Sequence, residues 1–291
     1  KAAYTHNFNI SFDGAEKRLR YYVMASYDGY KGLFNNTDLN EGYSTQYMNS
    51  TLKVRANLEA EITRTTKLRM NMSGRLSQNQ TPYAGTYVGS IYHTPAIAFP
   101  IRTPEGIWAR TELFPNPLAT YTQSGYSVSF QRTLLADIAV EQNLDAIAEG
   151  LKLTVKGAFD NSAVINDNHS KSYKYAYLAY DRDEQGNIIG HNWSEYGNDT
   201  DLSFGASLAS GGSVFTSFSV TGNLSYDRSF GKHGVSASAI WSMDRWKNRG
   251  KGSVYSYNDM ILRAGYDFSH RYIVDIVATC SGSAFLEQGS R

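Results

Sequence analysis

The sequence contains no run of 18 or more apolar residues, so no segment can cross a membrane as a helix. Its mean hydropathy is −0.43, a value typical of soluble chains. Membrane-spanning β-strands can have the same mean hydropathy, because lipid-facing and water-facing residues alternate along them. The missing apolar run therefore excludes a helical membrane protein and leaves a membrane barrel open.

Cysteine and net charge are almost absent as well. The single cysteine, Cys280, excludes an internal disulfide. The 28 basic and 27 acidic side chains leave a net charge of +1, so nothing attracts nucleic acid and no such partner is expected. What is abundant is tyrosine, with 22 residues. Its amphipathic ring suits membrane–water interfaces and interaction surfaces.

A secretion signal is also missing. Lys1-Ala2-Ala3 leads directly into a strand-like pattern, without a charged region, an apolar stretch or a cleavage site. A protein that reaches an outer membrane has to be exported, so we expect the chain to begin inside a longer protein. The last residues, Gln288-Gly289-Ser290-Arg291, contain no terminal strand, which also suggests a fragment.

Alternation with a period of two is the main structural signal. It is clearest from Thr51 to Thr63, where one face is apolar and the other strongly polar; the apolar residues are Leu52, Val54, Ala56, Leu58, Ala60 and Ile62, and the polar ones are Lys53, Arg55, Asn57, Glu59 and Glu61. The pattern resumes after Arg64-Thr65-Thr66, which predicts an antiparallel hairpin. The segment from Thr51 to Thr63 is roughly 13 residues long, which exceeds the length of ordinary strands and favours a tilted membrane-spanning strand.

Similar segments recur along the chain and predict about ten strands. Their apolar residues begin at Phe8, Tyr21, Leu52, Leu68, Leu134, Leu151, Phe218, Val235, Met260 and Tyr272. A further pair is predicted near Tyr173–Tyr180 and Leu202–Leu208. The predicted fold class is all-β, an antiparallel transmembrane β-barrel.

Short and long connections alternate. The short ones are Gly14–Lys17, Arg64–Thr66, Glu149–Gly150, Phe230–Gly234 and Ser269–His270; the long ones are Asp28–Gln46, Asn79–Ser127, Asp160–Thr200 and Asp244–Asn258. Outer-membrane barrels have short periplasmic turns and long extracellular loops, so the same asymmetry is expected here. The aromatic, proline-rich Asn79–Ser127 segment is expected to fold against itself or against a partner or ligand.

The order of several motifs resembles the barrel region of the SusC/RagA-type TonB-dependent transporters of Bacteroidetes. The motifs are His6 to Gly14 followed by Tyr21–Tyr27, Arg55–Leu58 ahead of Thr66–Leu68, Asn116-Pro117-Leu118-Ala119, Phe230-Gly231-Lys232-His233 and Arg271–Val274. Cys280-Ser281-Gly282-Ser283 departs from the Arg-Asp-Gly-Ser stretch that is common in the family.

The resemblance implies that residues 1–291 are a partial outer-membrane barrel domain, without signal peptide and plug, from a barrel of about 22 strands. It implies import of an oligosaccharide or peptide across the cell outer membrane, a SusD-like surface lipoprotein as partner, contact with outer-membrane lipid, and energy from TonB through the missing plug. Ligand contacts are expected at four loop aromatics: Tyr87, Tyr92, Trp108 and Tyr121.

No enzyme chemistry is predicted, so no catalytic residue and no cofactor are expected. The six histidines lack metal-ligand spacing, and no Gly-x-Ser-x-Gly elbow is present. Asp183–Asn187 is interpreted as a hairpin tip, since it matches a calcium loop only in part. Two other functions stay open: a passive porin-like barrel, and a soluble β-sandwich that binds carbohydrate.

Overall fold

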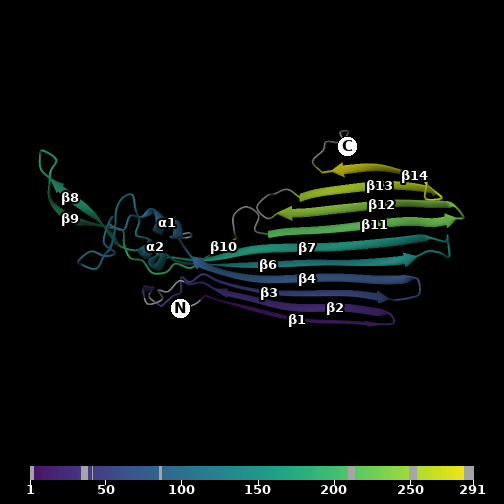
Figure 1. The fold of residues 1–291 in the computed structure, drawn as a ribbon, viewed down its shortest axis with the longest axis horizontal. Coiled ribbons are helices and arrows are strands. Elements are labelled where there is room, and N and C mark those ends of the chain that lie inside the picture. The colour runs from purple at the N-terminus through teal and green to yellow at the C-terminus, as the bar shows by residue number, and fades with distance from the viewer. Residues whose placement is uncertain are drawn as a thin grey trace.

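The computed structural model describes residues 3–33, 39–40, 42–84, 87–208, 214–248 and 254–284. Most of the chain forms one large antiparallel sheet (Figure 1). Its strands, in spatial order, are β1 (Tyr4–Glu16), β2 (Leu19–Lys31), β3 (Met48–Glu61), β4 (Thr66–Pro82), β6 (Gly125–Asn143), β7 (Leu151–Ser170), β11 (Val214–Phe230), β12 (His233–Asn248), β13 (Val254–Phe268) and β14 (Tyr272–Ser283), with β10 (Gly205–Leu208) paired to β7. The prediction of an all-β chain with about ten strands in one sheet is confirmed.

A small second sheet and two helices lie at one end of the large sheet (Figure 1). The second sheet has the order β5 (Trp108–Arg110), β8 (Tyr175–Arg182) and β9 (Ile188–Tyr196), and the helices are α1 (Tyr87–His93) and α2 (Pro117–Gln123). The five tight turns lie at the opposite end. The predicted separation of short turns from long loops is therefore confirmed.

Two of the tight turns show why their sequences suit them. Gly150 has a φ of 88°, and a Cβ there would lie 2.0 Å from the Asp227 carbonyl oxygen, so only glycine fits. Ser269 and His270 both have positive φ, 56° and 57°, and they are the central residues of a β-turn that the Arg271 backbone N–H closes by donating to the Phe268 carbonyl at 3.0 Å. The His270 backbone N–H donates to Asp267 Oδ1 at 3.1 Å, which stabilises that turn.

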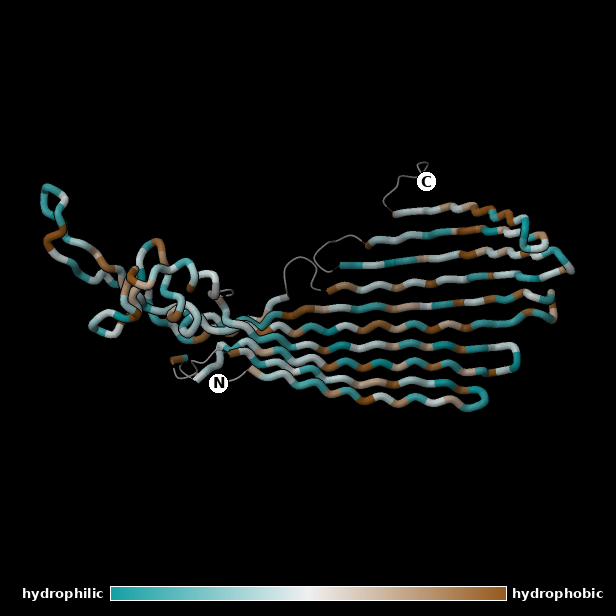
Figure 2. The backbone as a smooth tube through the Cα atoms, in the orientation of Figure 1, coloured by the Kyte–Doolittle hydropathy of each residue, from teal (hydrophilic) through white to brown (hydrophobic). Residues whose placement is uncertain are grey.

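The register places the alternating residues of neighbouring strands on common faces. Leu52 of β3 lies opposite Tyr27 of β2 and Leu76 of β4, and Lys53 lies on the other side of the strand. We call the side that carries Leu52 the apolar face and the side that carries Lys53 the polar face. Figure 2 shows the resulting alternation of hydrophobic and hydrophilic positions along each strand.

Nothing in the described part of the chain covers the apolar face. Leu52, Val54 and Ile62 keep exposed fractions of 40%, 42% and 55%, and neither sheet nor helix packs over them. A β-sandwich would bury one face of each sheet against a second sheet. The soluble β-sandwich is therefore excluded as the arrangement of these strands.

The large sheet does not close on itself. Within the described residues β1 pairs only with β2, and β14 pairs only with β13. A closed ten-stranded barrel, as the porin-like alternative would need, is not formed by these strands alone. No helix in the described part of the chain is long and apolar enough to span a membrane.

Four predicted loop boundaries were wrong, because the strands run further toward the loop end. β7 continues to Ser170, and β4 continues to Pro82. β2 reaches Lys31, and β12 reaches Asn248. In β7 the positions beyond Phe159 on the apolar face include Asn161 and Asp167, so the pattern weakens while the backbone ladder persists.

The predicted strands near Tyr173–Tyr180 and Leu202–Leu208 exist, but they do not pair with each other. β8 pairs with β9, and β10 pairs with β7. The predicted hairpin tip Asp183–Asn187 is confirmed as the β8–β9 turn, where Asp183 Oδ1 accepts hydrogen bonds from the backbone N–H groups of Gln185 and Asn187 at 3.0 and 2.7 Å.

Candidate functional site: an aromatic loop assembly

Helix α2 is held in place by Asn116, the residue before it. Asn116 Oδ1 accepts hydrogen bonds from the backbone N–H groups of Leu118 and Ala119 at 3.1 and 3.2 Å, which caps the helix. Its Nδ2 donates to the carbonyls of Ile101 and Ala109 at 2.9 and 2.8 Å. Pro117 suits the first helical turn, where no backbone N–H is needed. The motif thus joins α2 to β5.

Helix α2 also connects three loops that are far apart in the sequence. The Tyr43 hydroxyl donates to the Thr122 carbonyl at 2.8 Å, and Gln123 Nε2 donates to the Leu39 carbonyl at 2.6 Å. Thr120 Oγ1 lies 3.1 Å from the Tyr173 hydroxyl. We call the described residues of 39–47, 83–124 and 171–204 the loop assembly.

Trp108 lies inside the loop assembly. Its exposed fraction is 6%, and the guanidinium carbon of Arg102 lies 3.7 Å from its ring centroid. Arg102 is fixed in turn, because its Nη1 donates to the Gly106 carbonyl at 2.6 Å. The indole therefore packs within the loop, and its ring face is covered.

Tyr121 is buried as well, with an exposed fraction of 4% on α2. Burial raises the pKa of its hydroxyl, and a hydrogen bond with Thr45 opposes that effect. Thr45 is itself buried and accepts from Asn40 Nδ2 at 3.0 Å. Tyr121 therefore attaches α2 to the loop between β2 and β3.

Tyr92 is placed very differently from Trp108 and Tyr121. It lies on α1 with an exposed fraction of 85%, so its ring is open to solvent. Tyr87 begins the same helix, and its side chain lies outside the described part of the structure. The four aromatics predicted from the sequence are therefore brought into one assembly, but only Tyr92 is seen to be available for contact.

A second aromatic group was not singled out from the sequence. Tyr175, Tyr177 and Tyr196 gather on one side of the β8–β9 hairpin, with ring centroids 5.4 Å apart for Tyr175–Tyr177 and 4.8 Å apart for Tyr177–Tyr196. The Arg110 guanidinium carbon lies 4.7 Å from the Tyr175 centroid and 5.5 Å from that of Tyr177. We call these four residues the tyrosine platform.

The environment of the tyrosine platform acts on the hydroxyl of Tyr177. Desolvation is the main cause that raises the pKa of Tyr177, and a hydrogen bond with Tyr175 adds to it, while Arg110 opposes both. Tyr196 keeps an exposed fraction of 47%, so one edge of the platform faces water. Period-two spacing of Tyr173, Tyr175 and Tyr177 was the signal in the sequence that could have predicted a shared face.

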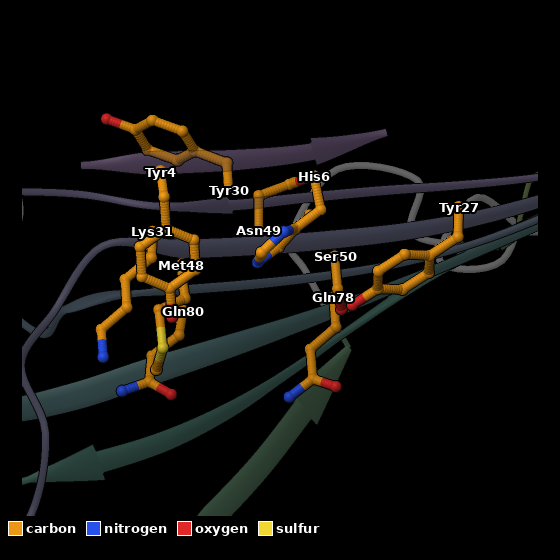
Figure 3. A pocket seen from close by; sticks show the side chains of 11 residues that line it. Tyr4, His6, Tyr27, Tyr30, Lys31, Met48, Asn49, Ser50, Gln78 and Gln80 are labelled. Atoms are coloured by element: carbon orange, nitrogen blue, oxygen red, sulfur yellow. The ribbon is translucent and has the colours of Figure 1, made fainter. Parts of the chain in front are cut away.

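A shallow hollow of about 270 Å³ lies at the loop end of β1 to β4 (Figure 3). Tyr4, Lys31, Met48 and Gln80 line it from the apolar face, and Lys31 Nζ lies 6.0 Å from the Tyr4 ring centroid. Tyr30 points to the other side of the sheet (Figure 3). Polar and aromatic side chains thus replace the aliphatic ones near the loops.

The polar face carries an ordered series of opposite charges. Arg20, Glu59, Arg69, Glu141 and Lys152 follow one another across five strands, with nitrogen–oxygen distances of 3.8, 3.3, 3.4 and 3.4 Å. We call these residues the charge ladder. No group of three or more His, Cys, Asp or Glu able to hold a metal occurs among the described residues.

No protein-family model and no curated protein matches this chain. Solved structures do. The RagAB peptide transporter matches with a TM-score of 0.57 at 14% identity, covering 96% of this chain and 32% of that one. The RagAB peptide importer in its 'open-open' state matches with a TM-score of 0.54 at 15% identity, covering 96% of this chain and 31% of that one. The chain thus spans about a third of these proteins, and the likeness establishes its fold.

Proposed function

We propose that this chain is part of the barrel of a TonB-dependent importer in the cell outer membrane. The observation that carries the proposal is the two-faced sheet, whose apolar face stays uncovered along strands of up to 20 residues. Exposed apolar patches on soluble proteins rarely exceed roughly 300–600 Å². Lipid is the environment that accepts such a face, and water beside the polar face accounts for the charge ladder.

The unpaired edges of β1 and β14 fit the same proposal. A strand edge in hydrocarbon leaves backbone N–H and C=O groups without partners, which costs several kcal/mol for each group. Closure through further strands of a longer protein removes both edges. A barrel of about 22 strands, with a plug in its lumen, has room for this sheet as slightly under half of its wall.

Capture of substrate is proposed at the loop assembly. Tyr92 and the tyrosine platform offer ring faces and one guanidinium, which suit peptide side chains and sugar rings. Trp108 and Tyr121 support this surface from inside, and Tyr87 begins the helix that presents Tyr92. The cargo is therefore proposed to be a peptide or an oligosaccharide; the RagAB neighbours are a peptide transporter and importer.

Two partners complete the proposal. A SusD-like surface lipoprotein would cover the loop end, where the β8–β9 hairpin extends beyond the large sheet (Figure 1). Exposed Tyr180, Ile188 and Ile189 on that hairpin, with exposed fractions of 52%, 55% and 69%, are surfaces that a partner protein would bury. TonB would act through the plug, which lies outside this chain.

Uptake by living cells tests the proposal. Cells that depend on the full-length protein should import a peptide pool or an oligosaccharide pool, and removal of TonB should abolish import while the protein stays in the outer-membrane fraction. Import that persists without TonB would favour the passive porin-like barrel. Recovery of the folded full-length protein in the soluble fraction would contradict a membrane location altogether.

A further inference from the structure

Arg132 is a cation on the apolar face. It belongs to β6, lies directly opposite Leu76 of β4 and Ala163 of β7, and its side chain is exposed. No ion pair or hydrogen bond of Arg132 occurs within the described part of the chain. Asn161, a polar neighbour on the same face, does have hydrogen-bond partners: its Nδ2 donates to Thr216 Oγ1 at 2.9 Å and to the Phe215 carbonyl at 3.2 Å.

A groove of about 380 Å³ runs beside Arg132. Most of its lining residues project from the apolar face, among them Tyr27, Leu52, Leu76, Phe130 and Ile165. Leu76 and Phe130 keep exposed fractions of 58% and 44%, so the groove is open along its length. Apolar side chains form most of its walls on the apolar face, together with Ser50 and Gln78, and Arg132 brings the one guanidinium that lines it.

The register places Arg132 beside the point where the apolar face of β1 to β4 becomes polar. Its cross-strand row contains Phe8, Tyr27, Leu52 and Leu76. The next row toward the loops contains His6, Gly29, Ser50 and Gln78. On β6 and β7 the same row continues with Phe130 and Ile165, which are apolar. Arg132 thus has a polar row on its β4 side, while apolar residues continue toward the loops on its own strand and on β7.

We propose that this groove binds an acyl lipid with a phosphorylated headgroup, taken from the membrane leaflet next to the loops, with its phosphate on Arg132. The planar guanidinium suits bidentate contact with phosphate, and the apolar walls suit acyl chains. Charge complementarity favours this occupant over a protein segment, because an unpaired cation facing lipid has phosphate as its nearest abundant counter-ion. This inference rests on the proposed membrane location and adds a lipid site to it.

Lipid binding to the purified full-length protein in detergent is the test, with lipid A as the probe and native mass spectrometry as the readout. The wild-type protein should retain lipid A, and Arg132→Gln should weaken retention at least about tenfold. Arg75→Gln is the matched control, since Arg75 lies on the adjacent strand β4 but on the polar face, and it should leave retention unchanged.

A second comparison needs no variant. Lipid A from which the phosphates have been removed should bind the wild-type protein at least about tenfold more weakly than lipid A itself. Equal binding of the two lipids, or equal retention by Arg132→Gln and the wild type, would overturn the lipid site. Loss of import in cells with intact phosphate-dependent lipid binding would count against the transport proposal alone.

Discussion

Arg69 of β4 bridges two carboxylates on different strands: its Nε lies 3.3 Å from Glu59 Oε2 on β3, and its Nη1 lies 3.4 Å from Glu141 Oε2 on β6. The three residues are the centre of the charge ladder. Exposed ion pairs contribute little in water, because solvent and salt screen them. Their regular order across the polar face gives each of these charges an opposite charge on the neighbouring strand.

The coupling between Arg69 and Glu141 should be small and salt-dependent. A double-mutant cycle with Arg69→Ala and Glu141→Ala should give a coupling energy of about 0.2–1 kcal/mol, measured by urea unfolding of the full-length protein in lipid vesicles. Raising the salt concentration should reduce it, because the pair faces water. A coupling that salt leaves unchanged would mean that this face is buried and dry.

A charge on the apolar face should be far more costly than one on the polar face. Val54→Arg should lower the free energy of unfolding by about 2–4 kcal/mol, because an arginine near the bilayer midplane loses its hydration. Ser73→Arg on β4 is the control, since Ser73 lies opposite Arg55 on the polar face. Similar losses for both variants, measured by urea unfolding in vesicles, would remove the evidence for lipid contact.

Asn116→Ala should loosen α2 within an intact large sheet. Loss of the cap should lower the local stability of the helix by about 0.5–2 kcal/mol and speed hydrogen exchange at Leu118 and Ala119. Asn116→Asp separates the two roles of the residue, because a carboxylate keeps the cap but cannot donate to Ile101 and Ala109. Unchanged exchange in Asn116→Ala would show that the tertiary contacts of α2 hold it without the cap.

The tyrosine platform should contribute to substrate affinity if capture occurs at the loop assembly. Tyr177→Ala and Tyr196→Ala should each weaken binding of a peptide pool or an oligosaccharide pool by roughly two- to tenfold, measured by calorimetry on the full-length protein. Tyr180→Ala is the control, because Tyr180 lies on the same strand as Tyr177 with its side chain on the opposite face. A loss in Tyr180→Ala equal to that in Tyr177→Ala would argue against the platform.

The tip of the β8–β9 hairpin should lose order in acid. Hydrogen bonds from the Asn187 side chain and then its backbone lower the pKa of Asp183 from its ordinary value of 3.8. Its contribution is therefore complete above that value and is lost as the pH falls through the lower pKa of the folded state. Hydrogen exchange at Gln185 and Asn187 should accelerate there. Asp183→Asn should lack this pH dependence.

The sequence was sufficient to predict the strands of the large sheet, because the alternation that marks each strand is a local pattern. A period of two from Leu52 to Ile62 depends only on consecutive residues, and the short turn after it sets the pairing with the next strand. The same reasoning failed beyond Phe159 of β7, where polar residues such as Asn161 and Asp167 interrupt the apolar face although the backbone ladder continues to Ser170. In this part of β7 the choice of residues depends on what surrounds the strand, so the pattern no longer predicts the strand itself.

The candidate site depended on contacts that no local pattern carries. The predicted loop aromatics include two, Trp108 and Tyr121, that pack inside the loop assembly, and one, Tyr92, that faces solvent. Their hydrophobicity is similar, so the sequence could not separate them. Trp108 is covered by Arg102, and Tyr121 is covered next to Thr45. Thr45 belongs to a different loop from Tyr121, so no local pattern could reveal that contact.

By itself, the sequence determined the strands, their two faces and the tight turns, because alternation and turn chemistry act between neighbouring residues. Only the tertiary structure decided which loop residues meet, which tyrosines form the platform, and that Arg132 stands among apolar side chains without an ion-pair partner in the described part of the chain. Those relationships join positions tens of residues apart, and the register of long antiparallel strands brings them together.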